Sequence, residues 1–130
     1  MKPLAALGQI ALSVTDADRA QAFYRDTLGL PFLFRFGPLV FLDCAGVRLM
    51  LDGGDEGVKG AGTGCMYFRT DDIADAHATL RSRGLRFDDE PHLIAKMPDH
   101  DLWMVFLRDT EGNTLALMSE VRGEEGGGRP

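Results

Sequence analysis

The alternation of apolar and polar positions at the start of the chain predicts a strand, a capped helix and a second strand within residues 8–32. Residues 9–14 alternate between small or polar side chains and apolar ones, which is typical of a strand with one buried face. Thr15 or Asp16 is placed to cap the helix that follows, in which apolar residues recur at helical spacing. Gly29 can adopt the left-handed conformation that ends a helix, and a proline two residues later prevents its continuation.

Three short apolar runs follow and predict a meander of strands. They cover residues 32–36, 39–44 and 47–51 and are separated by Gly37-Pro38 and Ala45-Gly46. Residues 52–64 hold six glycines in thirteen positions and lack the Gly-Lys-Ser/Thr ending of a phosphate-binding loop. We therefore interpret residues 52–64 as a linker.

The pattern then repeats, which indicates an internal duplication. Residues 65–70 alternate like a strand, Asp71 or Asp72 can cap a helix over residues 73–83, and Gly84 follows as Gly29 did. Further strands are expected at residues 91–96, 102–108 and 114–120, with a turn at residues 109–112 in which Gly112 accepts a positive φ. The polar and glycine-rich residues 122–130 have nothing to bury and predict a disordered tail.

Composition narrows the class of protein. A chain of 130 residues fits one domain, and 20 acidic against 14 basic residues give a formal charge of −6. This balance argues against nucleic acid as a partner and is compatible with cationic or neutral ligands. No apolar run approaches the ~20 residues that cross a bilayer, so we expect no membrane association. Cys44 and Cys65 are widely separated, which favours neither a disulfide scaffold nor a zinc knuckle and fits a cytoplasmic protein.

Two stretches resemble the vicinal oxygen chelate superfamily of glyoxalase, bleomycin-resistance and extradiol dioxygenase proteins. They are residues 18–30, from Asp-Arg-Ala through Phe-Tyr-Arg-Asp-Thr-Leu-Gly-Leu, and residues 108–113, Arg-Asp-Thr-Glu-Gly-Asn. The resemblance implies an α+β fold in which two tandem βαβββ modules form a cup-shaped, barrel-like mixed sheet with helices outside. It places one domain over residues 1–121, with modules at about 4–52 and 63–121, and implies a homodimer with its small-molecule site in the cup.

The resemblance also implies a divalent metal held by one residue from each of four strands. The matching positions in this sequence are Gln9, Met50, Cys65 and Ala116. Alanine contributes no ligand, a thioether is soft and neutral, and an amide is a weak donor, so this set does not suit a divalent cation. We therefore expect no metal cofactor, and we disfavour the usual glyoxalase or extradiol dioxygenase chemistry.

Strand alternation predicts which side chains line the cup. If the leucines of residues 47–52 face the helices, the intervening residues face the ligand, and the same holds for the second module. Arg48 and Arg69 can bind a carboxylate or phosphate, or can lie at a solvated rim. The predicted ligand-binding residues are Gln9, Arg48, Met50, Cys65, Tyr67, Arg69, Trp103 and Ala116.

Residues 90–103 concentrate chemically capable groups in a predicted hairpin. His92 or His100, next to Asp99 or Asp101, are candidate acid-base groups, and Trp103 is a candidate to stack on a planar ligand. A polar hairpin tip without a role in catalysis accounts for the same residues. With the hairpin centred near residue 99, His92 is expected opposite Phe106, and the third histidine, His77, is expected at a helix boundary.

Two functions from different classes follow from the sequence. The first is a metal-free protein that binds a small aromatic or cationic organic molecule in a crevice associated with a homodimer. The second is a lyase, isomerase or dioxygenase-like enzyme with an atypical metal site or none, using His92 or His100 in acid-base catalysis. The missing metal ligands favour the first, and the density of polar groups in residues 90–103 favours the second.

Overall fold

The computed structural model describes all residues except 1–2, 5, 55–64 and 123–130. The chain divides into two compact units, residues 1–61 and 62–130, and each is described by itself. The predicted linker at 52–64 and the predicted tail at 122–130 lie largely outside the described residues.

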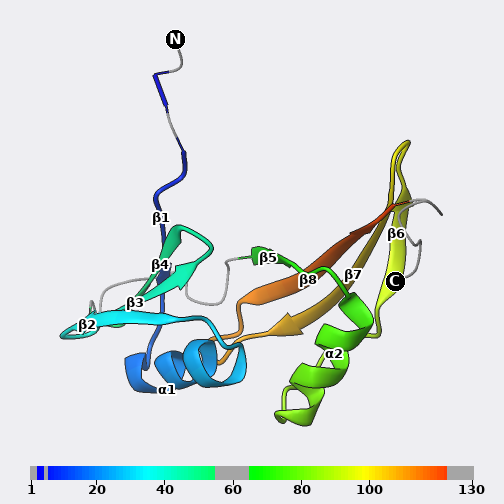
Figure 1. The fold of residues 1–130 in the computed structure, drawn as a ribbon. Coiled ribbons are helices and arrows are strands. Elements are labelled where there is room, and N and C mark those ends of the chain that lie inside the picture. Colours follow the sequence, from blue (N-terminus) through cyan, green and yellow to red (C-terminus); the bar gives the residue numbers. More distant parts are fainter. Residues whose placement is uncertain (1–2, 5, 55–64, 123–130) are drawn as a thin grey trace. The chain divides into compact units, whose positions relative to one another are not determined.

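The first unit is a four-stranded sheet with a helical segment on one face (Figure 1). The strand order is β1-β4-β3-β2, in which β1 and β4 are parallel and the other neighbours are antiparallel. Its elements are β1 (Gln9–Ser13), α1 (Ala17–Ala22), a π-helix η1 (Phe23–Thr27), β2 (Phe32–Phe36), β3 (Leu39–Cys44) and β4 (Val47–Asp52).

The helical segment begins and ends where the sequence predicts, but its second half is not an α-helix. Of the two candidate caps, the Asp16 carboxylate accepts the backbone N–H of Arg19 at 3.0 Å. From Phe23 onward the segment is a π-helix, with the N–H of Leu28 donating to the carbonyl of Phe23 at 2.9 Å. Gly29 then takes a φ of 82°, which ends the helix as predicted.

The second unit repeats the first in the same chain order. The sheet order is β5-β8-β7-β6, with β5 and β8 parallel and the other neighbours antiparallel. Its elements are β5 (Cys65–Arg69), α2 (Ile73–Ser82), β6 (His92–Lys96), β7 (Asp101–Arg108) and β8 (Thr114–Val121). The α+β class and the two tandem βαβββ modules are therefore confirmed, although neither four-stranded sheet closes into a barrel.

The capping and turn residues of the second unit match those of the first. The Asp72 carboxylate caps α2 by accepting the N–H of Asp75 at 3.0 Å, and Gly84 follows the helix with a φ of 90°. Gly112 takes a φ of 85° in the turn before β8, as its sequence position predicts.

The predicted register of the β6–β7 hairpin is wrong by two residues. His92 pairs with Met104 rather than with Phe106. The pairing of Lys96 with Asp101 centres the hairpin between residues 98 and 99, which accounts for one residue of the difference. An irregularity between Leu93 and Ala95 accounts for the other, because a bulged strand carries an extra residue that the partner strand does not match.

Each sheet buries the face against its helix and leaves the other face more open. In the first unit the side chains of Val40, Leu42, Leu49 and Leu51 alternate with more exposed neighbours and are at most 2% exposed. In the second unit Val105, Leu107 and Leu115 are buried in the same way beneath α2. The helix-free face of each sheet is therefore the place where polar and reactive side chains can meet a ligand.

Candidate functional site

Three predicted site residues come together on the helix-free face of the first unit. Gln9 lies across from Arg48, and Met50 follows two residues along β4. The Arg48 Nε donates to the Gln9 Oε1 at 2.9 Å, and the Gln9 Nε2 lies 4.0 Å from the Met50 Sδ. Of the three side chains, Gln9 supplies the atom best suited to bind a hard metal ion, its amide oxygen. That oxygen already accepts a hydrogen bond from the guanidinium of Arg48.

Two phenylalanines that the sequence analysis missed complete this face. Phe41 lies across from Met50 on β3, and the Arg48 Cζ lies 5.8 Å from the centroid of the Phe41 ring. Phe34 on β2 stacks on Phe41 with a centroid distance of 4.4 Å and an interplanar angle of 20°. Because residues 39–42 are all apolar, alternation within β3 carries no signal for which side chain faces outward.

The second unit places its predicted residues at the equivalent positions. Tyr67 lies across from Ala116, and Cys65 is two residues earlier on β5. In the first unit Ala11 lies across from Met50, and Gln9 is two residues earlier on β1. Ala116 also lies across from Phe106, which is therefore the counterpart of Phe41. The register thus supports the internal duplication residue by residue.

The side chains of Cys65 and Tyr67 interact with each other on this face. Tyr67 is 53% exposed and hydrogen-bonds to the Cys65 sulfur. That hydrogen bond, together with the negative charge that the sulfur carries at high pH, raises the pKa of Tyr67 above its ordinary value of 10.0.

We expect the Cys65→Ala variant to lower the pKa of Tyr67 toward 10.0, because the sulfur that disfavours the phenolate is removed. The change is measured by ultraviolet absorbance of tyrosinate during a pH titration of the folded protein. The only other tyrosine, Tyr24, is fully buried and is replaced by phenylalanine in the background used for the titration. An unchanged titration curve for the Cys65→Ala variant would contradict the contact.

Arg69 and Trp103 do not join the clusters described above. Arg69 lies on the same face as Tyr67, at the end of β5, and is exposed. Trp103 lies across from Ser119 and Leu93, and alternation along β7 puts it on the same face as Val105, against α2. The structure therefore separates Trp103 from the face that carries Tyr67.

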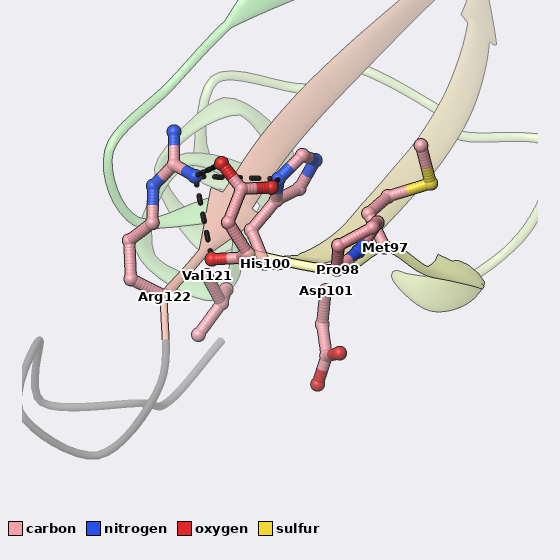
Figure 2. Close-up of a pocket in the computed structure, with 7 residues that line it drawn as sticks. Met97, Pro98, His100, Asp101, Val121 and Arg122 are labelled. Carbon is pink, nitrogen blue, oxygen red and sulfur yellow. Dashed lines mark hydrogen bonds and ion pairs between the residues drawn. The ribbon is translucent and has the colours of Figure 1, made fainter.

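The hairpin between β6 and β7 brings together two of the four acid-base candidates. The His100 Nδ1 lies 2.7 Å from the Asp99 Oδ1, and the His100 side chain is 14% exposed. Arg122, which the sequence analysis assigned to the tail, donates from Nη1 to the Asp99 Oδ2 at 2.6 Å. Figure 2 shows Arg122 beside His100. The Arg122 Nη1 lies 3.3 Å from the His100 Nδ1.

These contacts lower the pKa of Asp99 from its ordinary value, chiefly through the hydrogen bond with His100 and then through that with Arg122. The side chains border a hollow of about 350 Å³ at the end of the hairpin, lined by Met97, Pro98, Asp99, His100, Asp101, Val121 and Arg122. The arrangement ties the β6–β7 turn to the end of β8.

The remaining histidines and Asp101 have other partners. Asp101 pairs with Lys96 at 3.4 Å, and the His92 Nδ1 contacts the carbonyl of Glu90 at 2.7 Å. His77 is 7% exposed on α2, and its ring lies 4.4 Å from that of Phe87. His77 is therefore a packed residue at the edge of the core, as its helical position predicts.

The sequence matches the Glyoxalase/Bleomycin resistance protein/Dioxygenase superfamily over residues 6–117. Because this match covers most of the chain, the protein belongs to that superfamily. No curated protein matches the sequence significantly.

Solved structures of low sequence identity share the fold. Lactoylglutathione lyase from Agrobacterium tumefaciens is 23% identical, with a TM-score of 0.75, over 98% of this chain and 100% of that one. TnmS3, an antibiotic binding protein from Streptomyces sp. CB03234, is 22% identical, with a TM-score of 0.72, over 92% of this chain and 99% of that one. The fold therefore occurs both in a lyase and in an antibiotic-binding protein. Neither helix in the described part of the chain has the length and apolarity that a bilayer span requires.

The metal that the superfamily implies does not fit the donor set of this chain. In the first unit the Gln9 Oε1 accepts a hydrogen bond from the positively charged guanidinium of Arg48, and Met50 offers only a thioether. In the second unit Ala116 offers a methyl group beside a single thiol, that of Cys65. Among the residues that the structure describes, no group of three or more His, Cys, Asp or Glu side chains is arranged to hold a metal ion.

Proposed function

We propose that this protein binds a small organic molecule on the helix-free face of its sheets and that binding does not depend on a divalent metal. The observation that carries the proposal is the hydrogen bond from Arg48 to Gln9. It puts the positive charge of a guanidinium at the residue that, by the family resemblance, would bind the divalent metal ion, and like charges repel. Of the ligand classes that the sequence leaves open, aromatic or cationic, an aromatic ligand suits a face that carries this positive charge.

The surroundings of this hydrogen bond suit an organic ligand. The same face carries the exposed ring of Phe34, which lies on the largely buried ring of Phe41, and the thioether of Met50, beside a few polar groups that can orient a bound molecule. A soft, polarisable and partly apolar surface of this kind favours contacts with an organic ring over contacts with a hydrated ion.

We expect the protein purified without chelator or affinity tag to contain no stoichiometric Fe, Mn, Ni, Zn or Co. A metal at 100 times its dissociation constant adds about 2.7 kcal/mol to the free energy of unfolding, so a bound metal raises the midpoint by several degrees. We expect no such rise with any of the five metals. Elemental analysis and thermal shift measure both quantities, with chelator-treated protein as the reference. One tightly held metal per chain would contradict the metal-free proposal.

An enzyme that uses acid-base chemistry is the second candidate, and one observation favours it. The 2.7 Å contact between Asp99 and His100 borders a hollow and resembles the carboxylate–imidazole pairs that move protons. Arg122 also donates a hydrogen bond to the Asp99 carboxylate. The contact among these three side chains joins the hairpin to the end of β8, and this structural role explains it without a role in catalysis. We therefore place ligand binding first.

The homodimer and the cytoplasmic location expected from the sequence form part of this proposal. Strand β2 is an edge strand whose five residues, Phe32–Phe36, are all exposed, and an exposed apolar edge favours association with a second chain. A light-scattering mass equal to twice that of one chain would support this part.

A further inference from the structure

The arginine on the helix-free face of the first unit has spare hydrogen-bonding capacity. Arg48 uses its Nε to bond Gln9, and its guanidinium lies against the ring of Phe41. In the part of the chain that the structure describes, Arg48 makes no ion pair with a carboxylate. Asp43, which lies directly across on β3, instead accepts the backbone N–H of Gly46 at 3.1 Å. With respect to the described residues, the terminal nitrogens of the guanidinium are thus available to a further acceptor.

A stacking surface lies next to this charge. Phe34 and Phe41 are stacked in parallel at 4.4 Å, and Phe34 is 46% exposed, so part of its ring meets solvent. The order along the face is therefore Arg48, Phe41 and Phe34, with the charge at one end and the exposed ring at the other. Planar aromatic groups gain from such offset-stacked contacts beyond the area they bury.

Held by Gln9 at Nε and by Phe41 at its face, the guanidinium is restrained in position. A restrained guanidinium presents its two terminal nitrogens as a fork, which matches the two oxygens of a carboxylate. A cationic ligand meets repulsion at the same place. The net charge of −6 by itself is compatible with cationic or neutral ligands. The positive charge of Arg48 at this face instead favours an anionic ligand.

We infer that the ligand of the first unit is a planar aromatic anion, whose ring stacks against the exposed Phe34 and whose carboxylate binds Arg48, while the buried ring of Phe41 supports both side chains. This inference rests on the proposed function and narrows it to one ligand class. Gln9 is a positioning residue in this arrangement, because its amide oxygen holds the Arg48 Nε.

The test uses four naphthalene or carboxylate probes with the full chain. The probes are 2-naphthoate, neutral 2-naphthamide, cationic 2-naphthylmethylammonium and non-aromatic cyclohexanecarboxylate, and calorimetry or naphthalene fluorescence measures their dissociation constants. We expect 2-naphthoate to bind about tenfold or more tightly than each of the others, since it alone meets both the ring and the charge.

Variants assign the binding to this face. Arg48→Met keeps the side-chain length and removes the charge, and we expect it to weaken 2-naphthoate about tenfold to a hundredfold. Arg48→Lys keeps the charge without the fork, and we expect an intermediate loss. Phe34→Leu should weaken 2-naphthoate about threefold to tenfold and leave cyclohexanecarboxylate nearly unchanged. Arg86→Met is the matched control, because Arg86 is exposed on the loop after α2 and lies outside the face.

The outcomes separate this inference from the proposed function. Tighter binding of the neutral or cationic probe overturns the ligand class and leaves small-molecule binding in place. Equal binding of 2-naphthoate by Arg48→Met and the parent protein overturns the site. A shift of Arg48→Met or Phe34→Leu from dimer to monomer without a change in affinity shows that a second chain covers this face, which also overturns the inference. Failure of all probes and of a broad compound screen overturns the proposed function as well.

Discussion

Replacing Tyr24 with alanine should lower the free energy of unfolding by about 3–5 kcal/mol, in line with the removal of a large aromatic side chain from a core. Tyr24 is 0% exposed and is the largest of the fully buried side chains, and its ring contacts that of Phe23 edge-on at 5.4 Å. It lies in the π-helix that joins α1 to β2, so the cavity forms where the helical segment is anchored. Urea denaturation followed by circular dichroism measures the change.

Two variants make this expectation specific. Tyr24→Phe keeps the ring and should cost no more than about 1.5 kcal/mol, the net contribution of a hydrogen bond. Tyr67→Ala removes the same kind of side chain from an exposed position and should cost much less than Tyr24→Ala. Equal losses for Tyr24→Ala and Tyr67→Ala would show that the burial of Tyr24 has been misjudged.

Asp109→Ala should have the second largest effect, about 3 kcal/mol or more, because it leaves several buried donors without their acceptor. The Asp109 carboxylate accepts the backbone N–H groups of Glu111 and Asn113 at 2.8 Å and the Asn113 side-chain amide at 2.9 Å. Asn113 is 0% exposed, so water does not replace these bonds without opening the turn. The same urea titration measures the loss.

The controls for this variant vary the chemistry and the location. Asp109→Asn keeps an oxygen for the two backbone donors and loses the acceptor for the Asn113 amide, so we expect an intermediate loss. Asp88→Ala removes an exposed carboxylate that pairs with Arg108 at 3.2 Å and should cost less than about 1 kcal/mol. A loss for Asp109→Ala no larger than that for Asp88→Ala would contradict the role of this turn.

Helix starts, helix ends and tight turns could be predicted because single residues decide them. Asp16 and Asp72 cap their helices, and Gly29, Gly84 and Gly112 all have the positive φ that their places in the sequence indicate. These are local effects, in which one side chain or its absence sets the conformation of its neighbours. The π-helix at Phe23–Thr27 was not predicted, since its spacing of apolar residues does not differ enough from that of an α-helix over one turn.

The candidate site could be predicted only in part. The residues on the outward positions of β4 and β5, such as Arg48 and Tyr67, followed from strict alternation with the buried leucines of β4 and with the less exposed Met66 and Phe68 of β5. Phe41 was missed because residues 39–42 are all apolar, and Arg122 was missed because it stands next to a glycine-rich tail. The register of β6 against β7 was wrong because neither the exact centre of the turn nor a bulge leaves a clear mark in the sequence.

The sequence by itself determined the duplicated βαβββ order and the family, because each depends on which residues stand at fixed spacings along the chain, and on the same basis it predicts that the family's metal is not bound. The tertiary structure decided what the remaining side chains do. It joined Arg48 to Gln9 and Phe41, joined Asp99 to His100 and Arg122, and turned Trp103 away from the face that carries Tyr67. The physical reason is that the contacts of Arg48 with Gln9 and Phe41, and of Asp99 with Arg122, join segments far apart in the sequence, so they depend on strand order and register, which arise from the packing of the whole sheet.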